Sequence, residues 1–330
     1  MADDEEEDSC SEYADKSDKS GLVLSEIHFG KTRSGLGTTE TTWSFPLNER
    51  YDSDGDLVLD RKRRKNRYYY DVEDENESGE VGGGNITLRV DHENATVLER
   101  VGLQVWAGGL ALCDWLASKR EGSSPRGEVV LDLGCGTGLQ GIAAAALGCD
   151  AALLTDASEE ALALAEQNAE ANGVQRACFF RLLDWTRPLR PQLEPEKSSS
   201  GRFLWTPQDA LALSRATLIL AGDCAYEDGL TSHLVRTLKE LLSQFCHPQA
   251  VALVAAEKRW NFVRRGPGFE VGASAYDQLV RCLAGAVGLE VEEEEAPVSG
   301  ADVVLLRVRW RGEQSERTAH NEEKDERVYS

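Results

Sequence analysis

The sequence has 330 residues, of which 41% are hydrophobic, and its 58 acidic and 36 basic side chains give a net charge of −22. A chain of this length can bury a substantial core in one large domain or two small ones. So acidic a composition excludes strong direct binding to nucleic acid, because that binding depends on lysine and arginine side chains that neutralise phosphates. A partner with a basic surface is easier to accommodate, although acidic blocks often form only solvated tails or faces.

The first 85 residues predict a mostly disordered acidic region, in which only segments 21–29 and 41–47 are apolar enough to order. Its polyacidic start does not fit a signal peptide, and no apolar run in the chain reaches membrane-spanning length. The eight cysteines include no CxxC pair, so we expect reduced thiols and no zinc site. The basic run RKRRKNR, residues 61–67, favours import into the nucleus, with the cytoplasm as a second location; a nucleic-acid patch or local charge balance stays open.

From residue 86 the sequence alternates between strand and helix patterns. Apolar residues at helical spacing, Val105, Leu110 and Trp115 among them, precede a buried strand at 129–133 and a helix of small residues. Further strands and helices then follow in turn. This order predicts an α/β fold, a mostly parallel doubly wound sheet with helices on both faces. The last two strands have no helix between them, so we expect the sheet to end in an antiparallel hairpin.

The same patterns set the domain boundaries. We expect a folded domain at 86–312, interrupted by a Pro/Ser-rich surface loop at 188–201. A charged flexible tail at 313–330 would follow it. For the assembly we expect a monomer.

A glycine turn, LDLGCGTG, directly follows the strand at 129–133. Gly134 and Gly136 would let backbone N–H groups approach a ligand at the start of the next helix. Asp156 ends the next strand, about 20 residues further on, where an acid binds ribose hydroxyls. The chemistry therefore predicts a nucleoside-cofactor site at the carboxyl edge of the sheet. The GxGxG spacing disfavours a nicotinamide dehydrogenase, and a helix-entry turn without any ligand is the structural alternative.

The motif VLDLGCGTG, the acid at Asp156 and the terminal hairpin resemble the class I S-adenosylmethionine-dependent methyltransferases, which have a seven-stranded sheet. The pieces QVWAGG around Trp106, LLDW around Trp185 and the Asp-x-x-Tyr of DCAY narrow the resemblance to the methyltransferase-like lysine methyltransferases. The resemblance covers residues 98–310 and implies S-adenosylmethionine as the cofactor, with no metal.

What the resemblance implies for the cofactor can be placed on matching positions. The cofactor-binding residues would be Trp106, Gly134, Cys135, Gly136, Asp156, Asp184, Trp185 and Gly222. The turn would approach the amino-acid part of the cofactor, Asp156 its ribose, and Trp185 its adenine. Gly222 would line the methyl-donor end, where many relatives have Ala.

Some of these side chains have a structural alternative. Core packing is the alternative for Trp106 and for Trp185, and core packing is what we expect for Trp115. We interpret Cys135 and Cys224 as packing residues, because neither lies in a motif for nucleophilic or metal chemistry.

The acceptor end is predicted where the apolar strand ATLILAG, from residue 216, ends in Asp223 and Tyr226. A lysine amine has a pKa of about 10.4, so the enzyme must present it neutral, aligned and partly desolvated. Asp223 would hydrogen-bond the incoming ammonium and Tyr226 would wall the channel, with no formal general base required. A turn residue and a rim residue are the structural alternative. Glu257 ends the fifth strand on the same edge, and facing the target amine or pairing with Lys258 or Arg259 stay equal alternatives.

The sequence thus predicts a protein-lysine N-methyltransferase that acts on a basic, nuclear, nucleic-acid-associated protein. An RNA or small-molecule methyltransferase on the same fold stays open. A nucleic-acid methylase would show more basic surface and often an Asn/Asp-Pro-Pro-aromatic motif, which this sequence lacks. A cofactor-binding interaction module without catalysis is the remaining alternative.

Overall fold

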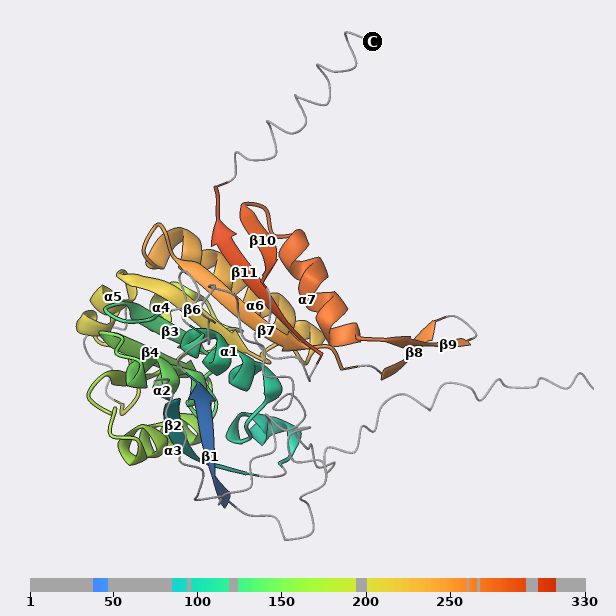
Figure 1. Ribbon diagram of the computed structural model, residues 1–330. Helices are drawn as coiled ribbons and strands as arrows, with labels where there is room; N and C mark the ends of the chain where they lie inside the picture. Colours follow the sequence, from blue (N-terminus) through green and yellow to red (C-terminus); the bar gives the residue numbers. More distant parts are fainter. Residues whose placement is uncertain are drawn as a thin grey trace, which may run out of the picture.

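The computed structural model describes residues 38–46, 85–93, 96–118, 124–193, 201–259, 261–265, 268–294 and 302–312. A seven-stranded sheet with strand order β10-β11-β7-β6-β3-β4-β5 forms its centre (Figure 1). Its strands in chain order are β3 (Val129–Leu133), β4 (Ala151–Asp156), β5 (Cys178–Leu182), β6 (Ala216–Gly222), β7 (Val251–Glu257), β10 (Leu289–Glu294) and β11 (Val303–Trp310). Strands β3 to β7 are parallel, whereas β11 runs antiparallel to β7 and β10. The predicted α/β sheet with its terminal hairpin is confirmed.

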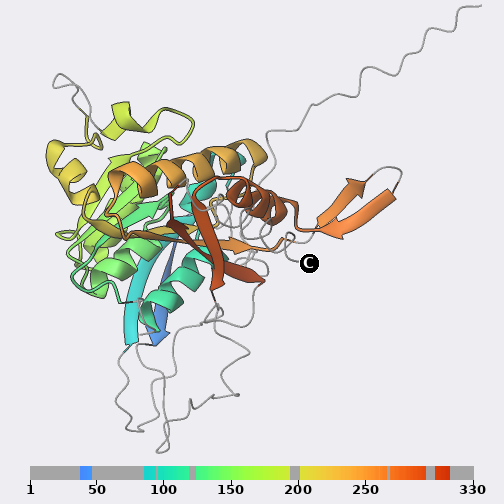
Figure 2. The same ribbon diagram turned by 90° about the horizontal axis from the view of Figure 1, so that it is seen from above.

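Helices cover both faces of this sheet (Figure 2). One layer consists of α1 (Ala107–Ala117), α2 (Leu139–Ala146) and α3 (Glu159–Ala171). The other contains α5 (Pro207–Leu213), α6 (Asp228–Glu240) and α7 (Ser274–Ala284). Successive residues of β3 face opposite layers, since Val130 packs under the first and Leu131 under the second. A strand buried on both faces explains why β3 reads as an unbroken apolar run apart from Asp132.

A strand from the acidic N-terminal region belongs to the first layer. β1 (Thr38–Pro46) pairs antiparallel with β2 (Asn85–Glu93), and Trp43, Phe45 and Leu88 are buried in the same core as α1. This strand overlaps segment 41–47, which the sequence marked as able to order. The basic run 61–67, the tail 313–330 and most of the first 85 residues lie outside the described residues.

Two segments depart from the expected pattern. The fifth strand of the sheet, β7, ends at Glu257, and a separate antiparallel hairpin of β8 (Asn261–Arg265) and β9 (Gly268–Gly272) projects beyond it (Figure 1). The Pro/Ser-rich stretch begins with a short helix, α4 (Leu189–Leu193), whose Leu189 and Leu193 are buried. Its remainder at 194–200 lies outside the described residues.

The acidic strand β10 is paired with two arginines of β11 and with Arg311, which directly follows it. Nitrogen–oxygen distances are 2.7 Å for Arg307–Glu294, 2.9 Å for Arg309–Glu292 and 2.8 Å for Arg311–Glu290. These cross-strand pairs offset much of the acidic charge of β10, so this block contributes less to an acidic face than its sequence indicates. No helix in the part of the chain that the structure describes is long and apolar enough to cross a membrane.

Candidate functional site

A cavity of about 510 Å³ opens at the carboxyl ends of the parallel strands. Strand ends, the short 3-10 segment η2 (Leu98–Leu103) and the start of α1 all contribute to its wall. Ten of the predicted site residues line it, and they are Trp106, Gly134, Cys135, Gly136, Asp156, Asp184, Trp185, Gly222, Asp223 and Tyr226. The structure thus brings the predicted cofactor residues and two of the three predicted acceptor residues to one cavity.

The glycine turn after β3 has no room for side chains. Gly134 has φ 73° and Gly136 has φ 53°, both in the left-handed region that favours glycine. A Cβ on Gly136 would lie 2.6 Å from the carbonyl oxygen of Gly102, and one on Gly134 would lie 2.8 Å from Sγ of Cys224. The turn therefore packs tightly against the segments that hold Gly102 and Cys224, and both of its glycines also line the cavity.

Asp156 lies beside this turn at the end of β4. Its Oδ2 accepts the N–H of Gly136 at 3.1 Å, and its Oδ1 accepts the N–H of Ser158 at 2.9 Å. Burial raises the pKa of this carboxyl, and the backbone N–H groups oppose that rise. Each carboxylate oxygen has a second acceptor position. The pair of oxygens therefore fits the hydroxyl groups of the ribose in the expected S-adenosylmethionine.

Trp106 precedes α1 and differs from the core tryptophan of the same helix. Its indole N–H donates to the carbonyl of Val101 at 2.9 Å, and the guanidinium of Arg259 lies 4.6 Å from its ring centroid. Trp115 is fully buried, in agreement with the expected core position. Trp106 instead lines the cavity, which is the position that a cofactor-binding residue would have.

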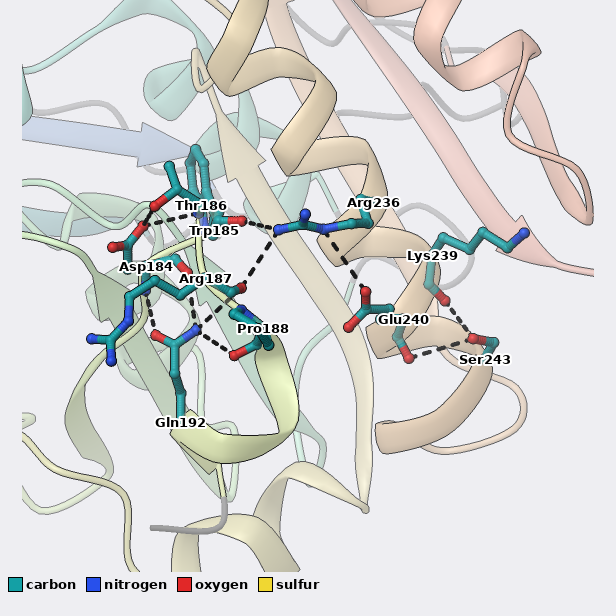
Figure 3. Close-up of polar contacts among 10 residues, drawn as sticks. All are labelled: Asp184, Trp185, Thr186, Arg187, Pro188, Gln192, Arg236, Lys239, Glu240 and Ser243. Carbon is teal, nitrogen blue, oxygen red and sulfur yellow. Dashed lines mark hydrogen bonds and ion pairs between the residues drawn. The ribbon is translucent and has the colours of Figure 1, made fainter. Parts of the chain in front are cut away.

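On the opposite side of the turn, Trp185 and Asp184 follow β5. The side chain of Asp184 accepts hydrogen bonds from the N–H and hydroxyl of Thr186, at 2.9 Å and 2.6 Å (Figure 3). The Trp185 ring lies so close to the turn that a Cβ on Gly134 would be 3.0 Å from it. Because Trp185 also lines the cavity, its ring offers a flat surface there, which agrees with the expected position of a planar adenine base.

Asp223 stands at the mouth of β6 in a left-handed conformation, with φ 51°, and its side chain is only 4% exposed. Its Oδ2 accepts the N–H of Gly108 at 2.5 Å, and its Oδ1 accepts the N–H of Glu257 at 2.9 Å. Asp223 therefore joins the ends of β6 and β7 to the start of α1. Aspartate is one of the few residues with a side chain that adopts such a φ readily.

Tyr226 is the more open of the two acceptor residues, at 37% exposed. Desolvation raises the pKa of its hydroxyl to about 12, with smaller contributions from Cys224, Asp156 and Glu227. The phenol is therefore protonated at neutral pH and available as a hydrogen-bond donor. Burial also raises the pKa of the Cys135 and Cys224 thiols, which is in keeping with packing roles.

Glu257 does not line the cavity. Its side chain is 7% exposed, and its Oε2 lies 3.4 Å from Nε of Arg259. Of the two alternatives left open by the sequence, local pairing is the contact that the structure contains. Arg259 itself lines the cavity, and its Nη2 lies 3.9 Å from Oδ1 of Asp223. The sequence did not predict that Arg259 lines the cavity, although a basic residue just after the carboxyl end of β7 was visible.

Asp132 is a second residue near the cavity that was not predicted from the sequence. It is fully buried in β3, where its Oδ1 accepts from Nε2 of Gln140 at 2.9 Å and its Oδ2 from the N–H of Gly141 at 3.0 Å. Burial raises the pKa of this carboxyl to about 8, although both hydrogen bonds oppose the rise. Gln140 lines the cavity, so Asp132 supports the wall from behind. An acid inside an apolar strand was the available signal.

Comparison with known proteins shows the family of this chain. A lysine methyltransferase family model matches residues 85–265. Methyltransferase-like protein 22 from Homo sapiens is 29% identical over 270 residues, which cover 74% of this chain and 63% of that protein. The Mus musculus protein of the same name is 32% identical over 198 residues, covering 58% of this chain and 48% of that protein. Protein-lysine N-methyltransferase EFM6 from Saccharomyces cerevisiae is 28% identical over 172 residues, which cover 48% of this chain and 64% of that protein.

These matches span roughly half to two thirds of the relatives' own lengths. The family model covers more than half of this chain and runs from the start of β2 to the end of β8. The matched region therefore contains the glycine turn, Asp156, Trp185 and the Asp-x-x-Tyr sequence that follows β6. The resemblance drawn from those motifs is confirmed. This chain belongs to the lysine methyltransferase family, and S-adenosylmethionine is its cofactor.

Proposed function

We propose that this chain is an S-adenosylmethionine-dependent protein-lysine N-methyltransferase whose substrate is a protein with a basic surface. The observation that carries the proposal is that the glycine turn and the Asp-x-x-Tyr residues line one cavity of about 510 Å³. A methyl donor and an acceptor must meet in such a shared space for direct transfer. The Saccharomyces cerevisiae relative is named a protein-lysine N-methyltransferase, which supports protein lysine as the acceptor class.

When bound beside the glycine turn and Asp156, S-adenosylmethionine would supply an electrophilic methyl group to a neutral lysine amine, with the neutral thioether as the leaving group and a proton released from the amine to water. The chain has to deliver the amine in its neutral form, because an ammonium has no free electron pair. Desolvation in the channel favours the neutral form. Arg259 on the cavity wall is paired with Glu257 and lies 3.9 Å from Asp223, so charges of both signs meet at this end of the cavity.

Within this proposal the residues at the carboxyl ends of β6 and β7 have different roles. Asp223 fixes the rim through its two backbone bonds and directs its remaining acceptor capacity to the amine. Tyr226 walls the channel and contacts the lysine stem. Glu257 acts through Arg259, whose guanidinium it holds at 3.4 Å.

We also propose a nuclear location and a nucleic-acid-associated substrate. The basic run 61–67 supports the location, and the net charge of −22 supports a basic partner. Contact with nucleic acid would then come through the substrate protein, because the acidic side chains of this chain outnumber the lysines and arginines that could bind phosphates.

The experiment that tests the proposal is incubation of the purified full chain with methyl-labelled S-adenosylmethionine and a nuclear extract. We expect the label in protein, in a form that protease digestion releases and ribonuclease does not. Label in RNA or in small molecules would replace protein lysine as the acceptor. Binding of S-adenosylmethionine without any transfer of label would contradict catalysis and support an interaction module.

A further inference from the structure

The loop at 184–188, between β5 and α4, carries the tryptophan that closes one side of the cofactor cavity (Figure 3). Its ring lies against the glycine turn, since a Cβ on Gly134 would be 3.0 Å from Cζ2 and Cη2 of Trp185. The ring thus packs on the turn and forms the boundary of the cavity on this side. Whatever fixes the backbone of Trp185 therefore fixes the position of this boundary.

On its inner side the loop is held by Gln192 of α4. The side-chain oxygen of Gln192 accepts the N–H of Asp184 at 2.9 Å. Its side-chain NH2 donates to the carbonyl oxygens of Asp184 and Pro188, both at 3.0 Å. One side chain thus ties the two ends of the loop together, but none of these bonds reaches Trp185 itself.

On its outer side the loop is held by Arg236 of α6. Nη2 of Arg236 donates to the carbonyl oxygen of Trp185 and lies 3.5 Å from that of Arg187. Figure 3 shows the guanidinium reaching from α6 to the loop, with Glu240 on the same helix at 3.8 Å from Nε. The Arg236–Glu240 pair is 44% and 34% exposed, and such a pair adds little stability by itself. The hydrogen bond to the Trp185 carbonyl, unlike the pair with Glu240, joins α6 to the loop.

We propose that Arg236 is a positioning residue that sets the Trp185 wall and so controls affinity for the nucleoside half of S-adenosylmethionine. The inference rests on the cavity being the cofactor site of the proposed methyltransferase. Helix α6 begins two residues after Tyr226, so one helix links the acceptor end of the cavity to its adenine end. Arg236 does not line the cavity and acts only through Trp185.

The test is calorimetric binding of S-adenosylmethionine and of adenosine to the purified full chain. A hydrogen bond from a charged donor is worth about tenfold in an equilibrium constant, and partial exposure reduces this. We expect Arg236→Ala to weaken both ligands by about three- to tenfold and Arg236→Lys to recover part of the loss. Arg281→Ala on α7, which removes an exposed arginine bonded only to Gln278 among the described contacts, should leave both affinities unchanged.

A double-mutant cycle separates positioning from general destabilisation. If Arg236 acts through Trp185, Arg236→Ala should cause no further loss of affinity in a Trp185→Ala background. Independent losses that multiply, or equal effects of Arg236→Ala and Arg281→Ala, would overturn the inference. Should Arg236→Ala fail to fold, the cycle runs with Arg236→Lys. A lack of methyl transfer with intact binding would count against the proposed activity alone, whereas an unaltered chain that binds no S-adenosylmethionine would overturn the site itself.

Discussion

Replacing Asp132 with Asn should change how the stability of the protein depends on pH. Asp132 is fully buried in β3, and burial raises its carboxyl pKa from 3.8 to about 8. Between these values the folded protein keeps a proton that the unfolded chain releases. The free energy of unfolding therefore has its full Asp132 contribution below about pH 4 and loses it as the pH rises through about 8.

One proton difference corresponds to a slope of about 1.4 kcal/mol per pH unit. Asp132→Asn keeps the size of the side chain and abolishes this titration. Its amide fits the site if the Gln140 amide turns over, because Gln140 would then accept where it now donates. We therefore expect the variant to have a flatter stability profile, with a slope smaller by up to about 1.4 kcal/mol per pH unit across the window.

The assay is urea unfolding of both proteins at several pH values between 4 and 8. Asp150→Asn is the matched control, because it makes the same chemical change at a side chain that is 56% exposed. The control should follow the unaltered chain. Parallel profiles for the unaltered chain and Asp132→Asn would show that Asp132 is not protonated in the folded state, and the reasoning from its burial would be wrong.

Two further predictions concern the cofactor and the location of the chain. Asp156→Ala should weaken binding of S-adenosylmethionine by about 1.5–3 kcal/mol, the scale of hydrogen bonds to a charged group, and calorimetry that gives unchanged affinity in the folded variant would contradict the ribose assignment. Replacing residues 61–65 with alanine should move a fluorescent fusion towards the cytoplasm without altering activity in vitro, and a fusion that stays nuclear would give the basic run another role.

The sheet and the glycine turn could be predicted from the sequence because their signals are local. An apolar run followed by Gly134 and Gly136 specifies a strand, a tight turn and a helix start within a dozen or so residues. The structure adds the reason that these glycines are needed, since each added Cβ would collide with another segment. Those segments, at Gly102 and Cys224, are distant in the chain and give no local sign of the contact.

Contacts between residues far apart in the chain could not be predicted from local sequence patterns. Arg236 is 51 residues from Trp185, and nothing in either neighbourhood indicates that they meet. The acids of β10 likewise read as a solvated face, because their arginine partners become visible only when β11 lies beside them. The β8–β9 hairpin was missed since its strands are only five residues long and directly follow the sheet strand β7.

The position of Asp223 explains why its role needs a direct test. Its carboxylate has a structural task, because it accepts backbone N–H groups of Gly108 and Glu257. Asn tolerates the left-handed conformation at φ 51° but presents a donor to one of those N–H groups. A folded Asp223→Asn preparation, verified by thermal unfolding, is therefore required before either function is compared.

Measuring cofactor affinity and methyl transfer on the same folded Asp223→Asn preparation tests most directly whether the mouth of β6 is the acceptor end of the site. We expect affinity for S-adenosylmethionine to stay within a few-fold and turnover to fall by on the order of 100-fold, the scale of losing one positioning or electrostatic contact. Tyr226→Phe should reduce turnover less, because the ring still walls the channel. Equal loss of affinity and turnover in Asp223→Asn would move Asp223 to the cofactor-binding residues, and full activity would leave it with a structural role alone.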